Sequence, residues 1–228
     1  MQHLALQVRG MLCDSDVVID LIGPRPPKKR GVPCCQEHDA TQQLEKLMRA
    51  HPLGAWVART KGVGDKQAAR LLGAISDPYW NDKHNRPRQL SELFSYCGLG
   101  DAQKQVRRRG VKANWSDTAK KRAWLISKSS IRTLRAPCHV PEGQAWAEHV
   151  KDCACGPYRL VYDATREAYA DTVHPHDCVR CGPSGSPALA GTPRSAGHLE
   201  AIALRAMSKQ LLADLWREAR DLHNAAPR

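Results

Sequence analysis

Apolar positions recur every three or four residues along much of the chain, which is the spacing of one face of an α-helix. The clearest run is residues 195–223, where Leu204, Met207, Leu211 and Leu215 follow that spacing. Shorter runs predict further helices over residues 2–22, 37–60 with a break at Pro52, 61–75, 89–97, 116–134 and 158–173. Because strand-like alternation is scarce, the sequence predicts a mainly α fold.

Proline, glycine and cysteine mark the expected boundaries between these helices. The segment GPRPPKKRGVP forbids regular structure after the first helix, and a Cys- and His-containing stretch precedes the last one. Four segments follow from these breaks. They are an N-terminal helix and linker (1–36), a helical domain (37–135), a Cys/His-rich insertion (136–195) and a closing helix that packs on the core (196–228).

Basic residues outnumber acidic ones, and the 228-residue chain has a formal net charge of +12. The charge is concentrated in PPKKRG, QVRRRGVK and TAKKRAW. An excess of this size favours a polyanionic partner, such as nucleic acid. Apolar runs are too short to predict a membrane span, and the N-terminus is a poor signal peptide. We therefore expect a cytoplasmic, nucleoid-associated protein without a membrane partner.

Two glycines stand two residues apart before a helix in KGVGDKQAARLLGAI, residues 61–75. Gly62 and Gly64 permit positive φ and leave backbone N–H groups uncovered, and the N-terminus of the next helix carries partial positive charge. These features predict a phosphate-binding turn, although a plain tight turn between two core helices is the alternative. The residues expected to form this turn are Lys61, Gly62, Val63, Gly64, Lys66 and Gln67.

A second group of basic residues follows in a predicted short hairpin and the helix after it. Three consecutive arginines next to a phosphate-binding turn favour a second contact with a nucleic-acid backbone. The residues expected to make it are Arg107, Arg108, Arg109, Lys112, Lys120 and Lys121. Trp115 and Trp124 lie beside these runs; helical core is their expected place, and stacking on bases is the alternative.

The glycine turn and its flanking helices resemble the helix-hairpin-helix motif, which holds the DNA backbone without reading bases. Residues 44–135 and 195–222 are similar to the C-terminal transposase domain of the IS-one-ten family of bacterial insertion sequences, whose recombinases are guided by a bridge RNA. The similarity lies in HPLGAWVARTKGVGDKQAARLLGAISDP, in the Tyr-Cys-Gly-Leu step of RQLSELFSYCGLG, and in HLEAIALRAMSKQLLADLW. The resemblance implies a DNA-binding protein of transposition or recombination, with RNA as an alternative ligand.

The family also has an RNase-H-like domain with metal-binding acids, and a serine just after the Gly-Leu step. Too few residues precede the matching region for such a domain, and no serine stands between Gly98 and Trp115. We therefore assign no catalytic residue, and magnesium is expected only with a separate catalytic subunit. The alternatives are an accessory protein that modulates another recombinase and an active nuclease with an unrecognised site. A homo-oligomer is open in each case.

Nine cysteines are present, which in a reducing compartment favours metal ligands over disulfides. Two close pairs, in CACG and CVRCG, are separated by a predicted helix and predict a structural zinc site. The expected ligands are Cys153, Cys155, Cys178 and Cys181, with Cys138, His139, His174 and His176 as alternates. Free thiols in loops are the other interpretation. Cys97 lies among apolar residues and is expected to be a buried thiol.

Overall fold

Helices predominate in the described part of the protein, as the apolar spacing predicts. The computed structural model describes residues 35–101, 104–105, 110–133, 142–143, 145, 148, 156–179, 181–183 and 186–225. The helices are α3 (Cys35–Ala50), α4 (Gly54–Arg59), α5 (Asp65–Ile75), α6 (Leu90–Tyr96), α7 (Asp117–Thr133), α9 (Pro157–Ala168) and α10 (Ala196–Ala225). Two short antiparallel strands, β1 (Trp80–Asn81) and β2 (Arg86–Pro87), pair with each other.

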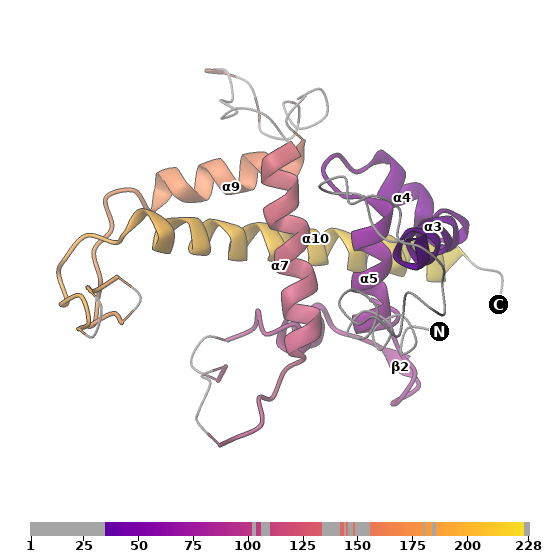
Figure 1. Cartoon of the computed structure of the whole chain (residues 1–228), viewed down its shortest axis with the longest axis horizontal. Helices are drawn as coiled ribbons and strands as arrows, with labels where there is room; N and C mark the ends of the chain where they lie inside the picture. Colours follow the sequence, from indigo (N-terminus) through magenta and orange to yellow (C-terminus); the bar gives the residue numbers. More distant parts are fainter. Residues whose placement is uncertain are drawn as a thin grey trace.

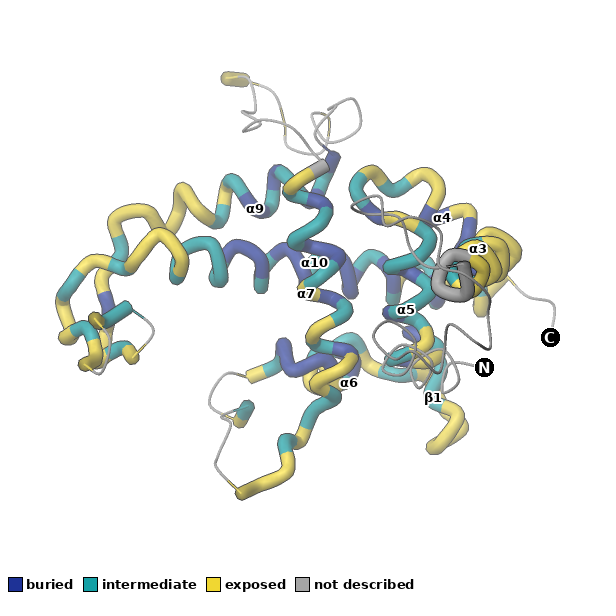
Figure 2. Tube along the Cα trace, viewed as in Figure 1, coloured by how far each residue is buried: buried dark blue, intermediate teal, exposed yellow. Residues whose placement is uncertain are grey.

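The 30-residue helix α10 is the axis about which the other helices are arranged. In Figure 1 it crosses the molecule, with α9 beside its first half, α7 across its middle, and α3 and α5 near its C-terminal end. Leu204, Met207, Leu211, Leu212 and Leu215 are at most 2 % exposed, and Figure 2 shows buried positions along the middle of this helix. Burying each such side chain contributes about 1.5–3 kcal/mol, so the predicted stripe of α10 forms the centre of the core.

Small residues on α7 allow this helix to cross α10 closely. Ala119, Ala123, Ser127 and Ser130 are fully buried. Ser127 Oγ lies 2.8 Å from Ser208 Oγ of α10, and each hydroxyl is also within hydrogen-bond reach of a carbonyl of its own helix. Since these buried hydroxyls are hydrogen-bonded, they can be tolerated inside the core.

Predicted helix starts agree with the structure where a serine caps the helix. The Ser116 hydroxyl accepts a hydrogen bond from the Ala119 amide at the start of α7. The Ser195 hydroxyl does the same for the His198 amide at the start of α10. Both hydroxyls accept hydrogen bonds from amides in the first turn of their helix, where no carbonyl four residues earlier belongs to the helix, and so mark where each helix begins.

Several local predictions are wrong. Helix α9 ends at Ala168 and not near residue 173. Between the helices predicted at 61–75 and 89–97, where the sequence predicts only a loop, β1 and β2 pair through a turn in which Asn85 adopts a φ of 47°. Trp124, predicted to be in the core, is 43 % exposed.

Most of the predicted basic hairpin, at 102–103 and 106–109, lies outside the described residues.

Cys97 is buried, as predicted, and burial raises the pKa of its thiol to about 12 from a usual value of 9.0. The thiolate is the reactive form, so its fraction in the folded protein is roughly 1,000-fold smaller than for an ordinary cysteine. We expect Cys97 to resist iodoacetamide at pH 8 in the folded protein and to react fully in guanidinium chloride. Peptide mass spectrometry measures this, and rapid labelling of the folded protein would contradict it.

No helix in the described part of the chain combines the length and the apolar character needed to cross a membrane.

Candidate metal centre

A cluster of cysteine and histidine side chains lies in the segment that joins α9 to α10. This segment is tied together by two isolated antiparallel bridges, Val173 with Pro193 and Cys178 with Ala188. The Cys178 amide donates to the Ala188 carbonyl over 2.8 Å, and the Ala188 amide donates back over 2.9 Å. The Cys181 amide donates to the Cys178 carbonyl, which closes a turn over the two cysteines. Backbone hydrogen bonds therefore place both sulfurs on one side of the loop.

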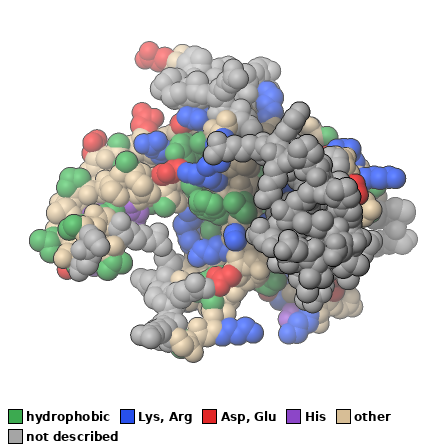
Figure 3. Space-filling view, viewed as in Figure 1, with side chains coloured by type: hydrophobic (Ala, Val, Ile, Leu, Met, Phe, Trp, Pro, Cys, Tyr) green, Lys and Arg blue, Asp and Glu red, His purple; other side chains and the backbone are tan. Residues whose placement is uncertain are grey.

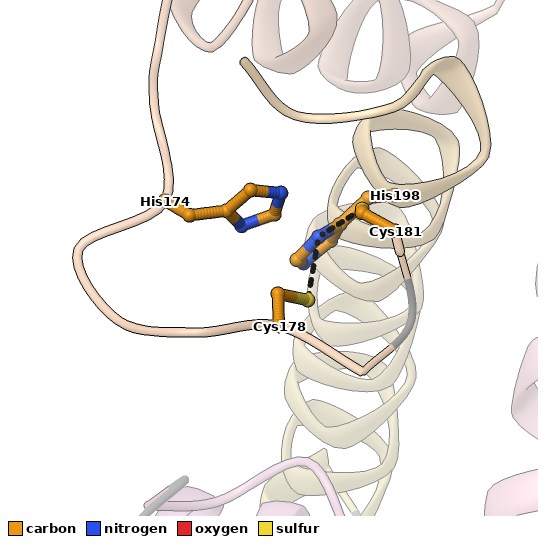
Figure 4. Close-up of side chains that lie close together, drawn as sticks. All are labelled: His174, Cys178, Cys181 and His198. Carbon is orange, nitrogen blue, oxygen red and sulfur yellow. Dashed lines mark hydrogen bonds between the residues drawn. The ribbon is translucent and has the colours of Figure 1, made fainter. Parts of the chain in front are cut away.

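Four potential metal ligands converge at this point: His174, Cys178, Cys181 and His198. Their ligand atoms all lie within 4.8 Å of one another. His198 Nδ1 is 3.7 Å from Cys178 Sγ and 3.3 Å from Cys181 Sγ, and Figure 4 shows both contacts as dashed lines. The His174 ring lies beside the His198 ring, with 5.2 Å between their centroids. This arrangement can hold a metal ion.

The environment of His174 supports metal binding over a chance approach of four side chains. His174 is 2 % exposed, and its Nε2 atom has no hydrogen-bond partner among the described residues. A buried polar atom without a partner is costly, and most buried polar atoms in proteins have one. A metal ion bound through Nε2 would give this nitrogen a partner, so the donors present fit a bound cation.

The start of α10 stabilises the thiolate form of Cys181. A hydrogen bond from the Ser195 hydroxyl to the sulfur, 3.0 Å long, lowers the pKa of the Cys181 thiol, and the nearby positive charge of Arg194 acts in the same direction. Ser195 thus caps α10 and contacts a metal-ligand sulfur with the same side chain. Since a cysteine binds metal as thiolate, this surrounding favours coordination.

Gly182, directly after the second cysteine, is required by the close approach of the chain. A Cβ built at this position would lie 1.8 Å from the Ser186 carbonyl oxygen and 2.6 Å from the Ala188 amide nitrogen. Real side chains do not approach backbone atoms so closely. The glycine of CVRCG therefore allows the loop to fold back on itself.

The structure brings together half of the predicted ligand set. Cys178 and Cys181 are in the cluster, and the alternate His174 joins them, whereas His176 is exposed and is not part of it. Cys153 and Cys155, as well as Cys138 and His139, lie outside the described residues. His198 was missed. Its signal was a histidine in the first turn of a helix that begins shortly after a Cys-x-x-Cys pair.

The predicted phosphate-binding turn joins α4 to α5. Gly62 has a φ of 86°, in the region that favours glycine, and its carbonyl accepts a hydrogen bond from Ser130 of α7. Val63 packs into the core. Lys61 is exposed, whereas Lys66 and Gln67 are half-buried. The turn therefore has an inner side, held by α7, and an outer side that includes Gly64.

Gly64 is exposed at the N-cap of α5, with a φ of −96°. A Cβ at this position would meet no atom of the described residues within 4 Å, so the fold leaves room for a side chain there. Asp65 stands in the first turn of the helix, and Arg49 donates to its carboxylate over 2.7 Å. This ion pair offsets the negative charge beside the helix N-terminus.

Of the six other predicted nucleic-acid contacts, three lie in the described part of the chain and three do not. Lys112 and Lys121 are exposed. The Nζ atom of Lys120 lies 4.9 Å from the centre of the Trp115 ring. Arg107, Arg108 and Arg109 lie outside the described residues.

No protein-family model matches the chain, and no match is found among curated proteins or solved structures.

Proposed function

We propose that the protein is a zinc-stabilised DNA-binding protein of transposition or a related recombination process. The observation that carries the proposal is the open N-terminus of α5 at Gly64, where the chain has a glycine although the fold leaves room for a side chain. A helix N-terminus attracts phosphate through its free N–H groups and its dipole. A glycine there lets a phosphate approach the backbone.

The charge of the turn and of the chain supports a nucleic-acid backbone as the ligand. Lys61 and Lys66 flank the turn, Arg49 offsets Asp65, and the whole chain carries +12. Contacts of this kind fix a protein on nucleic acid without reading bases. The resemblance to the transposase domain of insertion sequences adds the process, transposition or recombination, and makes a separate catalytic subunit the source of any magnesium-dependent chemistry.

Zinc is the ion that best suits the cluster of two cysteines and two histidines. With Zn–S near 2.3 Å and Zn–N near 2.0–2.1 Å, a tetrahedral site separates sulfur and nitrogen ligands by about 3.6 Å. The two sulfur-to-nitrogen distances at His198, 3.7 and 3.3 Å, lie on either side of this value. Four protein ligands leave no open position for substrate, so the zinc is structural and holds the loop between α9 and α10.

The phosphate contact is tested with Gly64→Asp. Aspartate is a good N-cap residue in the extended conformation found here, so thermal stability should stay the same or rise slightly. Its carboxylate would lie at the N-terminus of α5, where a phosphate would approach the backbone, and would repel it. We expect the Kd for duplex DNA, measured by fluorescence anisotropy, to rise roughly 10- to 150-fold, as for loss of hydrogen bonds to a charged group.

The matched control is Asn85→Asp, which adds the same charge on the exposed turn between β1 and β2. The control should change the Kd for duplex DNA by less than about twofold, since a single distant surface charge is largely screened. A Gly64→Asp variant that binds duplex DNA as tightly as the parent across a salt series would rule out the phosphate contact.

A further inference from the structure

One large aromatic side chain stands on the outer face of α7. Trp124 is 43 % exposed, although α7 packs against α5, α9 and α10. Trp115, near the start of the same helix, is held by its neighbours: its Nε1 donates to Asp117 over 3.0 Å, and Lys120 covers its ring. Exposing a large apolar ring to water is unfavourable. The packing of the core therefore gives no reason for a tryptophan at position 124.

Basic side chains flank Trp124 on the same stripe of α7. Lys121, Lys128 and Arg132 share this side of the helix, within an arc of about 80° and a length of about 16 Å. Lys128 is paired with Glu200 of α10, whereas Lys121 and Arg132 are exposed. In Figure 3 a hydrophobic patch near the centre of the view, over α7, is bordered by Lys and Arg.

We infer that this face of α7 binds a single-stranded or unwound nucleic-acid segment, with Trp124 stacked on an unpaired base and Lys121 and Arg132 on the phosphates to either side. Aromatic rings flanked by positive charge are the usual means of holding single strands, because every base offers a face for stacking. A paired duplex keeps its bases inside and offers no such face. The inference rests on the proposed nucleic-acid-binding function and adds unpaired strands to its substrates.

The flanking charges favour nucleic acid over a protein partner. Lysine is depleted at protein interfaces, whereas aromatic residues and arginine are enriched there, so it is the charge that disfavours a protein partner. Here Lys121 and Arg132 are both positive and both exposed, on a chain with a net charge of +12. Such a surface is complementary to a phosphate chain, and the single ring between the charges suits one base.

The test uses a fluorescein-labelled single-stranded oligothymidylate of about 20 nucleotides, which cannot form a duplex with itself. Trp124→Ala should raise the Kd for this strand roughly 5- to 150-fold, the range found when an aromatic stacking residue is removed. Trp124→Phe, which keeps a flat ring, should restore most of the affinity. Circular dichroism checks that both variants keep the helical content of the parent.

Salt dependence separates the ring from the charges. The double variant Lys121→Ala with Arg132→Ala should lower the slope of log K against log salt by about 1.4, because each phosphate contact on a single strand contributes about 0.7. Trp124→Ala should leave that slope unchanged, since stacking releases no counterions. Tyr169→Ala is the control. Tyr169 is 39 % exposed at the C-terminal end of α9 and lies beside Arg194, so it is a comparable aromatic residue away from α7.

Two outcomes overturn the inference. One is a Trp124→Ala variant that binds the single strand like the parent. If that variant also shows less self-association in ultracentrifugation, Trp124 belongs to a protein interface. The other is a folded Trp124→Phe variant that is as weak as Trp124→Ala. The turn at Gly64 is tested on duplex DNA and Trp124 on a single strand, so the two proposals can fail separately. If Gly64→Asp binds duplex DNA like the parent, the proposed backbone contact is wrong, but the single-strand result at Trp124 still stands.

Discussion

Replacing Cys178 and Cys181 together by serine is expected to release one bound zinc and to unfold the loop between α9 and α10. In this loop Val173, Val179 and Leu189 are 47 %, 83 % and 64 % exposed, so it buries little apolar surface of its own. In small zinc-dependent folds the metal supplies about 10–16 kcal/mol of apparent binding energy, which is also folding energy. The metal, and not a core, should therefore order this segment.

Elemental analysis and hydrogen exchange measure the two parts of this result. Zinc should fall from about one ion per chain to none. The amides of His174, Cys178 and Ala188, which form hydrogen bonds within the loop, should lose protection, whereas amides in the middle of α10 should keep theirs because its core is formed with α7 and α9.

A variant within the same loop provides the control. Val179 lies between the two cysteines and is 83 % exposed, so Val179→Ser should retain both zinc and protection. If the parent, purified without chelator, contains no zinc, or if the double serine variant keeps the loop protected, the metal has no structural role here.

The sequence predicts the cysteine pair and gives His174 as an alternate ligand, but it does not predict His198, and the reason is the range of the interactions. Cys178 and Cys181 are brought together by a local turn, which a Cys-x-x-Cys motif signals directly. His198 joins them only because the two antiparallel bridges bring the chain back beside the cysteines just before α10 begins. That approach depends on how α9 packs on α10, which no short motif encodes.

The helices themselves were largely predictable, because apolar spacing and capping serines are local signals. The position of Trp124 on the outer side of α7 was not. A pattern based on apolar size places Trp124 inside, but a close crossing with α10 requires the small side chains of Ala123 and Ser127 at the contact. The crossing distance selects small residues for the interior and leaves the tryptophan outside.

The glycine turn shows the same limit for function. The sequence predicts a turn between two helices, and the structure has one at residues 60–64. Gly62 is explained by its positive φ, whereas the fold does not require the glycine at position 64. The difference between the two glycines appears only in the folded structure, and it directs the binding test to Gly64.

Gly182→Ala is expected to lower zinc affinity on the order of 10- to 100-fold, the range seen when a residue that supports metal ligands is changed. The added Cβ would lie 1.8 Å from the Ser186 carbonyl oxygen. No side-chain rotation relieves a contact with backbone. The chain on the other side is tied to Cys178 through two hydrogen bonds at Ala188, so the loop must open and displace Cys181.

Competition with a chromophoric zinc chelator measures this change, and Gly197→Ala is its control. Gly197 lies next to His198 in the first turn of α10, and a Cβ there would meet no atom within 4 Å. Alanine should leave zinc affinity unchanged and stabilise the helix by up to about 1 kcal/mol. Gly182 has no side chain that could bind the metal, so Gly182→Ala leaves the set of ligands unchanged. Weaker zinc binding by this variant alone would show that the folded-back loop sets the affinity for zinc. An unchanged zinc affinity would contradict this role of the loop.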